Sequence, residues 1–283
     1  MTAATWLLPG IPRSGTSLCC RLVGSLPEAV ALSEPLRLAE LDGLESADDA
    51  CEYIDRRLVD MRQQAQEDGR VPSTHVDGEL NDSRVALETS DTGLRAPQGV
   101  QGEMRVDKPL SPDFLLLVKH NALFAALMPP LSVAHCCIAL VRNPVAVLAS
   151  WQTVDLPVNR GQLPGGELYD SVLRARLAGE SDTLQRQLHI LDWFFRCYSE
   201  SLPGDRILKY EEVIASGGRA LFSALGREVG PMEDLASQNS SRLYANVDIA
   251  RLSNALASRD GAWRSFYTDV ECHGLAEQLR GGL

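Results

Sequence analysis

A short apolar run that passes through a glycine turn into a helical stretch constrains the fold more than any other feature of this chain. Thr5–Leu8 is apolar enough for a buried strand, Pro9–Gly15 is a glycine-containing turn, and the pattern from about Thr16 to Leu26 is helical. A strand that leads directly into a turn and a helix is typical of α/β folds with parallel sheets. The backbone N–H groups of such a turn, together with the helix N-terminus, can bind an anionic group.

The rest of the chain continues this alternation of strands and helices. Ser46–Asp68 predicts an amphipathic helix that Ser46 can cap, because apolar residues recur there at helical spacing. Further strands are predicted at Met104–Asp107, Val133–Val141 and Arg206–Tyr210. Further helices are predicted from Ser111 to Pro129-Pro130, from Asn143-Pro144 to Trp151, and across Leu184–Tyr198. We therefore expect a three-layer α/β fold whose central, mostly parallel sheet has about four or five strands.

Length and composition limit the classes of protein that this chain can belong to. Its 283 residues suit one domain, 1–283, in which the polar stretch 69–102 is a long loop or a small inserted subdomain. The net charge of −11 argues against a nucleic-acid partner. No apolar run reaches the ~20 residues of a membrane span, so no membrane partner is expected. Seven cysteines without a CxxC motif favour a reducing, cytoplasmic setting. The sequence does not predict the oligomeric state.

The glycine turn carries its positive charge at an unusual position. The spacing from Gly10 to Gly15 fits the nucleoside-triphosphate loop GxxxxGK[ST], but Thr16 stands where that loop has lysine. The cation lies inside the loop instead, at Arg13, and the run Val133–Val141 ends in Arg142 rather than in an acid that would support Mg²⁺. This pattern argues against a metal-dependent ATPase or GTPase, and no metal is expected. A glycine turn that merely joins a strand to a helix is the simpler alternative.

Three segments resemble PAPS-dependent sulfotransferases, in that family's order. The run Pro12-Arg13-Ser14-Gly15-Thr16-Ser17 resembles the loop that binds the 5′-phosphosulfate of 3′-phosphoadenosine 5′-phosphosulfate (PAPS). Arg142, with Ser150 eight residues on, is similar to the pair that holds the 3′-phosphate. Lys209-Tyr210-Glu211-Glu212 resembles a (R/K)YE(D/E) segment after a later strand. The resemblance implies a P-loop-like fold, PAPS as co-substrate and adenosine 3′,5′-bisphosphate as product. A strand-end arginine that reaches solvent and a serine that packs beside Trp151 remain open alternatives for the second match.

The catalytic residues that the resemblance implies are a base and two cations. Arg13 and Lys108, which follows the predicted strand Met104–Asp107, would stabilise the leaving group. Cytosolic small-molecule enzymes of the family have Lys-x-His at this place, but here the second position is Leu110. The branch of tyrosylprotein sulfotransferases and related bacterial enzymes uses a glutamate after the first helix, which corresponds to Glu34. Glu34 can act as the general base if its pKa is raised, or it only complements a helix dipole.

The resemblance also suggests residues for the adenine end of the nucleotide. Tyr210 is the candidate for an adenine contact, although a tyrosine after a strand is also a common core residue. Arg259, in Arg259-Asp260-Gly261, resembles a loop that closes over the nucleotide, and a solvent-facing arginine is the alternative. His120 and His135 flank apolar segments and are expected to be structural.

These observations predict an enzyme that moves a sulfuryl group from PAPS to a hydroxyl of a small molecule, such as a secondary metabolite or a carbohydrate. Two other functions stay open. One is a P-loop nucleotide-dependent kinase, and the other is a non-catalytic nucleotide-binding module with a degenerate sulfotransferase fold.

Overall fold

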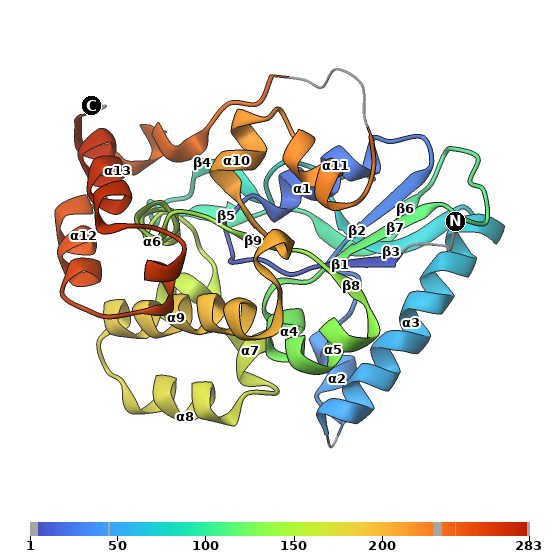
Figure 1. Ribbon diagram of the computed structural model, residues 1–283, viewed down its shortest axis with the longest axis horizontal. Coiled ribbons are helices and arrows are strands. Elements are labelled where there is room, and N and C mark those ends of the chain that lie inside the picture. Colours follow the sequence, from blue (N-terminus) through green and yellow to red (C-terminus); the bar gives the residue numbers. More distant parts are fainter. Residues whose placement is uncertain (1–4, 45, 229–233, 241, 282–283) are drawn as a thin grey trace.

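The computed structural model describes residues 5–44, 46–228, 234–240 and 242–281. Its centre is a parallel sheet of four strands in the order β2-β7-β1-β8, flanked by helices (Figure 1). These strands are β2 (Ala29–Ser33), β7 (Leu115–Lys119), β1 (Thr5–Leu8) and β8 (Cys136–Cys137). A parallel pair, β9 (Ala139–Val141) and β10 (Ile207–Lys209), continues from this sheet through a bridge between Gly10 and Leu140. The expected α/β class with a mostly parallel sheet is confirmed.

Alternation along β1 creates the layers on the two faces of the sheet. Leu7 points into one apolar cluster, and Trp6 and Leu8 point into another, as the period of two along a strand requires. The first cluster packs under α3 (Ala47–Glu67), α4 (Asn121–Ala126), α5 (Met128–Ala134), α6 (Pro144–Trp151) and α9 (Thr183–Ser201). The second packs under α1 (Thr16–Gly24), α10 (Tyr210–Ala215) and α11 (Arg219–Ala224). The remaining helices are α2 (Leu38–Leu41), α7 (Pro164–Glu167), α8 (Ser171–Gly179), α12 (Ile249–Ala257) and α13 (Asp269–Gly281).

Several predicted elements are confirmed at nearly the expected residues. The first strand and its helix, the strand Ile207–Lys209 and the helix from Pro144 agree with the structure. The amphipathic helix α3 begins after Ser46, whose side chain accepts a hydrogen bond from the backbone N–H of Asp49.

The predicted helix from Ser111 to Pro129-Pro130 is confirmed at Asn121–Ala126, which is α4, and is wrong over Leu115–Lys119. Leu115–Lys119 is instead the buried strand β7, because five consecutive apolar or enclosed positions suit a strand that is covered on both faces. Pro129 and Pro130 do not end a helix but lie in the first turn of α5, where their missing N–H groups cost nothing. Helix α5 extends to Ala134, so the predicted strand Val133–Val141 is reduced to β8 and β9. Strand β2 was not expected.

The polar stretch 69–102 folds into two antiparallel strand pairs, which we call the β-insert (residues 70–105). Strand β3 (Arg70–His75) pairs with β6 (Val100–Arg105), and β4 (Val85–Thr89) pairs with β5 (Arg95–Pro97). The predicted strand Met104–Asp107 is therefore the end of β6, outside the central sheet. In the described ranges, no helix is both long enough and apolar enough to cross a membrane.

Candidate functional site

A cavity of about 830 Å³ opens at the carboxyl edge of the sheet. Parallel strands present their carboxyl ends at one edge, so the segments that follow β1, β2, β7 and β9 meet there. The β-insert covers part of the wall, and segments from the second half of the chain complete it. The cationic side chains of the wall belong to Arg13, Arg21, Arg84, Arg95, Lys119 and Arg142, and the acidic ones to Glu34, Asp82 and Asp234.

Glycine is required at two positions of the turn after β1. A Cβ at Gly10 would lie 2.3 Å from Cγ2 of Thr16, and a Cβ at Gly15 would lie 2.7 Å from Cδ2 of Tyr210. Gly15 also has a φ of +98°, which favours glycine. The backbone N–H of Ile11 donates to the carbonyl of Leu140 at 3.2 Å, which ties the turn to β9. Pro12, Gly15, Thr16 and Ser17 line the cavity together with Arg13, as expected of an anion-binding loop.

Ser14 is the exception among the expected loop residues. Its side chain is fully buried, and its hydroxyl donates to the carbonyl oxygen of Leu140 at 3.0 Å. Ser14 therefore holds the loop against the sheet, and its hydroxyl does not face the cavity.

Arg13 extends its guanidinium across the cavity from a left-handed backbone conformation, with φ at 74°. Its Nε donates to Oγ of Ser150 at 3.2 Å, and Nη1 donates to Oγ of Ser83 in the β-insert at 3.3 Å. Burial, and next the nearby charge of Arg95, lower the pKa of Arg13 to about 10. Arg13 is still a cation at neutral pH, and both of its acceptors are uncharged.

Arg142 faces the same cavity from the end of β9. Its Nη1 donates to the backbone oxygen of Arg13 at 2.9 Å, and its Nε donates to Oδ1 of Asn239 at 2.8 Å. The guanidinium lies over the ring of Tyr210, 4.5 Å from the ring centre. Nη2 is buried and has no hydrogen-bond partner within the described residues. Such a donor is available to an anionic ligand, since a buried unpaired donor is costly.

The Lys209-Tyr210-Glu211-Glu212 segment supports this corner. Tyr210 lines the cavity, and its hydroxyl accepts a hydrogen bond from the backbone N–H of Gln238 at 3.0 Å. The carboxylate of Glu211 accepts from the backbone N–H of Asn143, from Asn239 Nδ2 and from the Tyr267 hydroxyl. Glu211 therefore fixes the residues that surround Arg142.

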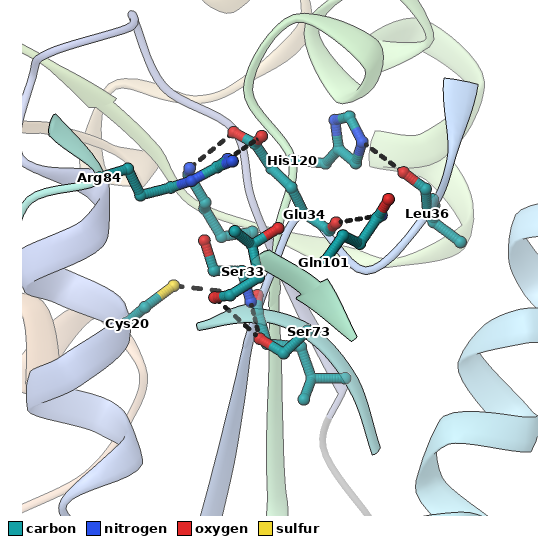
Figure 2. A network of polar contacts seen from close by, with 11 residues as sticks. Cys20, Ser33, Glu34, Leu36, Ser73, Arg84, Gln101 and His120 are labelled. Carbon is teal, nitrogen blue, oxygen red and sulfur yellow. Dashed lines mark hydrogen bonds and ion pairs between the residues drawn. The ribbon is translucent and has the colours of Figure 1, made fainter. Parts of the chain in front are cut away.

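Glu34 sits at the end of β2 between two cations (Figure 2). One carboxylate oxygen accepts from Nζ of Lys119 at 2.7 Å, and the other pairs with Arg84 of the β-insert. The Glu34 side chain is 27% exposed. Burial alone would raise its pKa, but the charges of Lys119 and Arg84 outweigh burial and hold the pKa well below its usual range. The raised pKa named above as a condition for a base at Glu34 is not met, and Glu34 is ionised at neutral pH.

Lys108 does not lie at the cavity, which corrects its expected role. Strand β6 pairs with β3 in the β-insert and not with the central sheet, and Lys108 is not among the residues that line the cavity. Nζ of Lys108 donates to the backbone oxygens of Gly24 and Leu26, both at 2.6 Å, and closes the end of α1. Lys119 is the lysine at the end of a central strand, and it lines the cavity. The prediction of a helix across this segment concealed it.

Ser150 and Arg259 also differ from expectation. Ser150 is fully buried and does not line the cavity, and its hydroxyl accepts a hydrogen bond from Nε of Arg13. Arg259 follows α12, and its guanidinium donates to Gln185 Oε1 at 3.2 Å and to His189 Nδ1 at 2.6 Å. It does not line the cavity. The C-terminal part reaches the cavity through the segments 234–238 and 243–244 instead.

Several cavity residues were missed from the sequence. His120 lines the cavity beside Glu34, and its Nε2 lies 3.2 Å from the backbone oxygen of Leu36 (Figure 2). Its Nδ1 has no partner within the described residues, and burial lowers the pKa of the ring. His135 instead contacts Asp55, as expected of a structural histidine. Arg84 and Arg95 come from the β-insert, where only the polar composition hinted at a functional wall.

No family model matches this sequence, and no curated protein matches it.

Proposed function

We propose that this protein is a PAPS-dependent sulfotransferase that sulfates a hydroxyl of a small molecule. The proposal rests above all on one observation: Arg13 and Arg142 come from two separate strand ends and line one cavity. Neither pairs with a carboxylate in the described part of the chain, since their acceptors are hydroxyl, amide and carbonyl oxygens. Two unneutralised guanidinium groups in a protein of net charge −11 suit a ligand with more than one phosphate.

The donor would bind at the β1 and β9 side of the cavity. The turn Pro12–Ser17 and Arg13 would hold the 5′-phosphosulfate, and Arg142 would hold the 3′-phosphate with its free Nη2 donor. The ring of Tyr210 packs against the guanidinium of Arg142 and is adjacent to Gly15. This arrangement uses backbone N–H groups and arginine side chains in place of the lysine and metal of ATP-binding loops.

The acceptor would bind at the β2 and β7 side, next to Glu34 and Lys119. The acceptor side and the donor side lie at different places along the sheet, because β7 lies between β2 and β1. The wall here includes Leu38 and Leu163, and Gly165 lies against Leu38 and Ala122. These apolar contacts favour a compact, partly apolar alcohol, such as a secondary metabolite, over a carbohydrate.

In the proposed step, the acceptor oxygen bonds to sulfur while the bond from sulfur to the bridging phosphate oxygen breaks. That oxygen keeps the electron pair and leaves as part of adenosine 3′,5′-bisphosphate, and Arg13 neutralises its charge. The hydroxyl proton passes to Glu34 and later to water. A raised pKa is not needed, because an oxygen that has begun to bond to sulfur is a far stronger acid than an alcohol. Lys119 keeps Glu34 ionised and oriented.

We propose a cytoplasmic setting from the state of the cysteines. All seven cysteines are free, which fits a reducing compartment such as the cytoplasm.

Nucleotide binding tests the function. Isothermal titration should show that adenosine 3′,5′-bisphosphate binds the wild type without a metal, and that Arg13→Ala and Arg142→Ala each weaken it about tenfold or more. Arg105→Ala, an exposed position in the β-insert, is the matched control and should bind as the wild type does. Transfer of label from PAPS to a panel of small alcohols then measures the activity. Binding of ATP with Mg²⁺ but not of the bisphosphate would favour a kinase and reject the proposal.

A further inference from the structure

Arg95 is, like Arg142, a buried arginine at the cavity, and the function proposed above gives it no role. It lies in β5 of the β-insert, its residue is only 3% exposed, and it lines the cavity together with Arg13 and Arg142. Its Nη2 donates to Oγ1 of Thr153 at 2.7 Å, and its Nε donates to the backbone oxygen of Thr153 at 3.4 Å. No carboxylate pairs with it in the described residues. A buried cation without a countercharge is costly unless a ligand supplies that charge.

Backbone hydrogen bonds also hold Arg95 in this position. Its N–H donates to the oxygen of Thr153 at 3.0 Å, and its own oxygen accepts from the N–H of Asp155 at 2.9 Å. These bonds form a parallel bridge between Arg95 and Val154, directly after α6. The β-insert is therefore attached to the segment that follows Ser150, at the end of the cavity where the 3′-phosphate is proposed to lie.

Ser150 does not line that end of the cavity. The family resemblance pairs its hydroxyl with Arg142 around the 3′-phosphate, but here Ser150 is fully buried and its hydroxyl accepts a hydrogen bond from Arg13. Arg95 and Arg13 both line the cavity, and the charge of Arg95 lowers the pKa of Arg13. An anion placed there would relieve their mutual repulsion.

We infer that Arg95 of the β-insert, with Arg142, binds the 3′-phosphate of the nucleotide in the place that the resemblance gives to Ser150. This inference rests on the proposed function. It makes the β-insert part of the donor site, in addition to its contact with Glu34 through Arg84. It also predicts that the contribution of Arg95 depends on the presence of the 3′-phosphate.

The test compares two nucleotides that differ only in that phosphate. For Arg95→Ala, the Kd of adenosine 3′,5′-bisphosphate should rise about tenfold to a hundredfold, whereas the Kd of adenosine 5′-phosphate should change by less than about threefold. Arg95→Lys keeps the charge but not the planar fork, so it should restore part of the lost affinity. Arg105→Ala should leave both dissociation constants unchanged.

A second variant covers the possibility that Arg95→Ala does not fold. Thr153→Val removes the hydroxyl that orients the guanidinium and keeps the charge, and it should weaken the bisphosphate selectively but less strongly. An unchanged Kd in both variants, or an equal loss for both nucleotides, would overturn the inference. If Arg13→Ala and Arg142→Ala still weaken the bisphosphate in that case, the proposed function stands. If the wild type binds no bisphosphate at all, both proposals fall together.

Discussion

Glu34 shows how one side chain can combine several constraints. Its backbone N–H donates to the oxygen of Lys119 at 2.7 Å, its backbone oxygen accepts from Gln101, and its carboxylate joins Lys119 to Arg84. The sheet and the β-insert thus meet at one residue (Figure 2). Because two cations fix the carboxylate, its position relative to a bound hydroxyl is set before the acceptor arrives.

Glu34→Gln tests the proposed role of the carboxylate in the reaction. The amide is nearly the same size but cannot accept the hydroxyl proton, so we expect kcat to fall about a hundredfold or more. The affinity for adenosine 3′,5′-bisphosphate should stay within about threefold of the wild type, because Glu34 lies on the acceptor side. Turnover is measured with labelled PAPS and the best acceptor from the panel, with Glu103→Gln, an exposed glutamate of the β-insert, as the control. Retention of wild-type kcat in Glu34→Gln would exclude Glu34 as the base.

At the scale of elements, the turn between β1 and α1 depends on its packing against Tyr210. Gly15→Ala would place a methyl group 2.7 Å from Cδ2 of Tyr210 at a φ of +98°. We expect the free energy of unfolding to fall by about 2–4 kcal/mol, since strain and a steric clash add. Urea denaturation measures the loss.

Gly78→Ala is the matched control for that turn. Gly78 has a similar φ of +87°, but a Cβ there meets nothing within 4 Å. It should lose only about 1 kcal/mol, from the backbone conformation alone. Equal losses in the two variants would show that the contact with Tyr210 is unimportant.

The sequence predicted those elements whose local pattern and tertiary role agree. Ser46 and the spacing of Ile54 and Leu58 marked α3, and Asn143-Pro144 marked α6. The prediction failed at Leu115–Lys119, because a continuous apolar run has no period that separates a buried strand from a buried helix. That error moved the expected strand-end lysine from Lys119 to Lys108.

The residues of the candidate site also fall into those that the sequence predicted and those that it did not. Arg13 and Arg142 follow strands that were recognised, so their meeting at one edge could be expected from topology. The positions of Arg84 and Arg95 depend on how the β-insert docks, which only long-range contacts such as Arg95 with Thr153 determine. Ser150 is buried because the whole of α6 is enclosed by other elements, and spacing along the chain does not encode that packing.

At the scale of the whole molecule, acid should destabilise the protein over a wide pH range. Burial lowers the pKa of His120 from its ordinary 6.5, so the unfolded chain takes up a proton first as the pH falls below 6.5. The pKa of Glu34 is held below its ordinary 4.5, despite burial, by Lys119 and Arg84, so its stabilisation is present above 4.5 and is lost below it. Both groups therefore favour unfolding on acidification.

Thermal or urea unfolding measured from pH 7 to pH 3 checks this expectation. The wild type should lose up to about 2 kcal/mol of unfolding free energy through the linkage of Glu34 below pH 4.5, in addition to the loss from His120 above it. Glu34→Gln should be less stable at pH 7 but should flatten the lower part of the profile, and His120→Gln should flatten the upper part. A wild-type profile that is level from pH 7 to pH 4 would contradict the linkage to His120.

The left-handed backbone at Arg13 and Glu34 places the two most consequential side chains in conformations that favour glycine, with φ at 74° and 48°. Each costs on the order of 1 kcal/mol that a glycine would not incur. Glycine at either position would remove this strain, but it would also remove the hydrogen bonds of Arg13 to Ser83 and Ser150 or the ion pairs of Glu34 with Lys119 and Arg84. The contacts of these side chains and the packing around them therefore outweigh the backbone strain at Arg13 and Glu34.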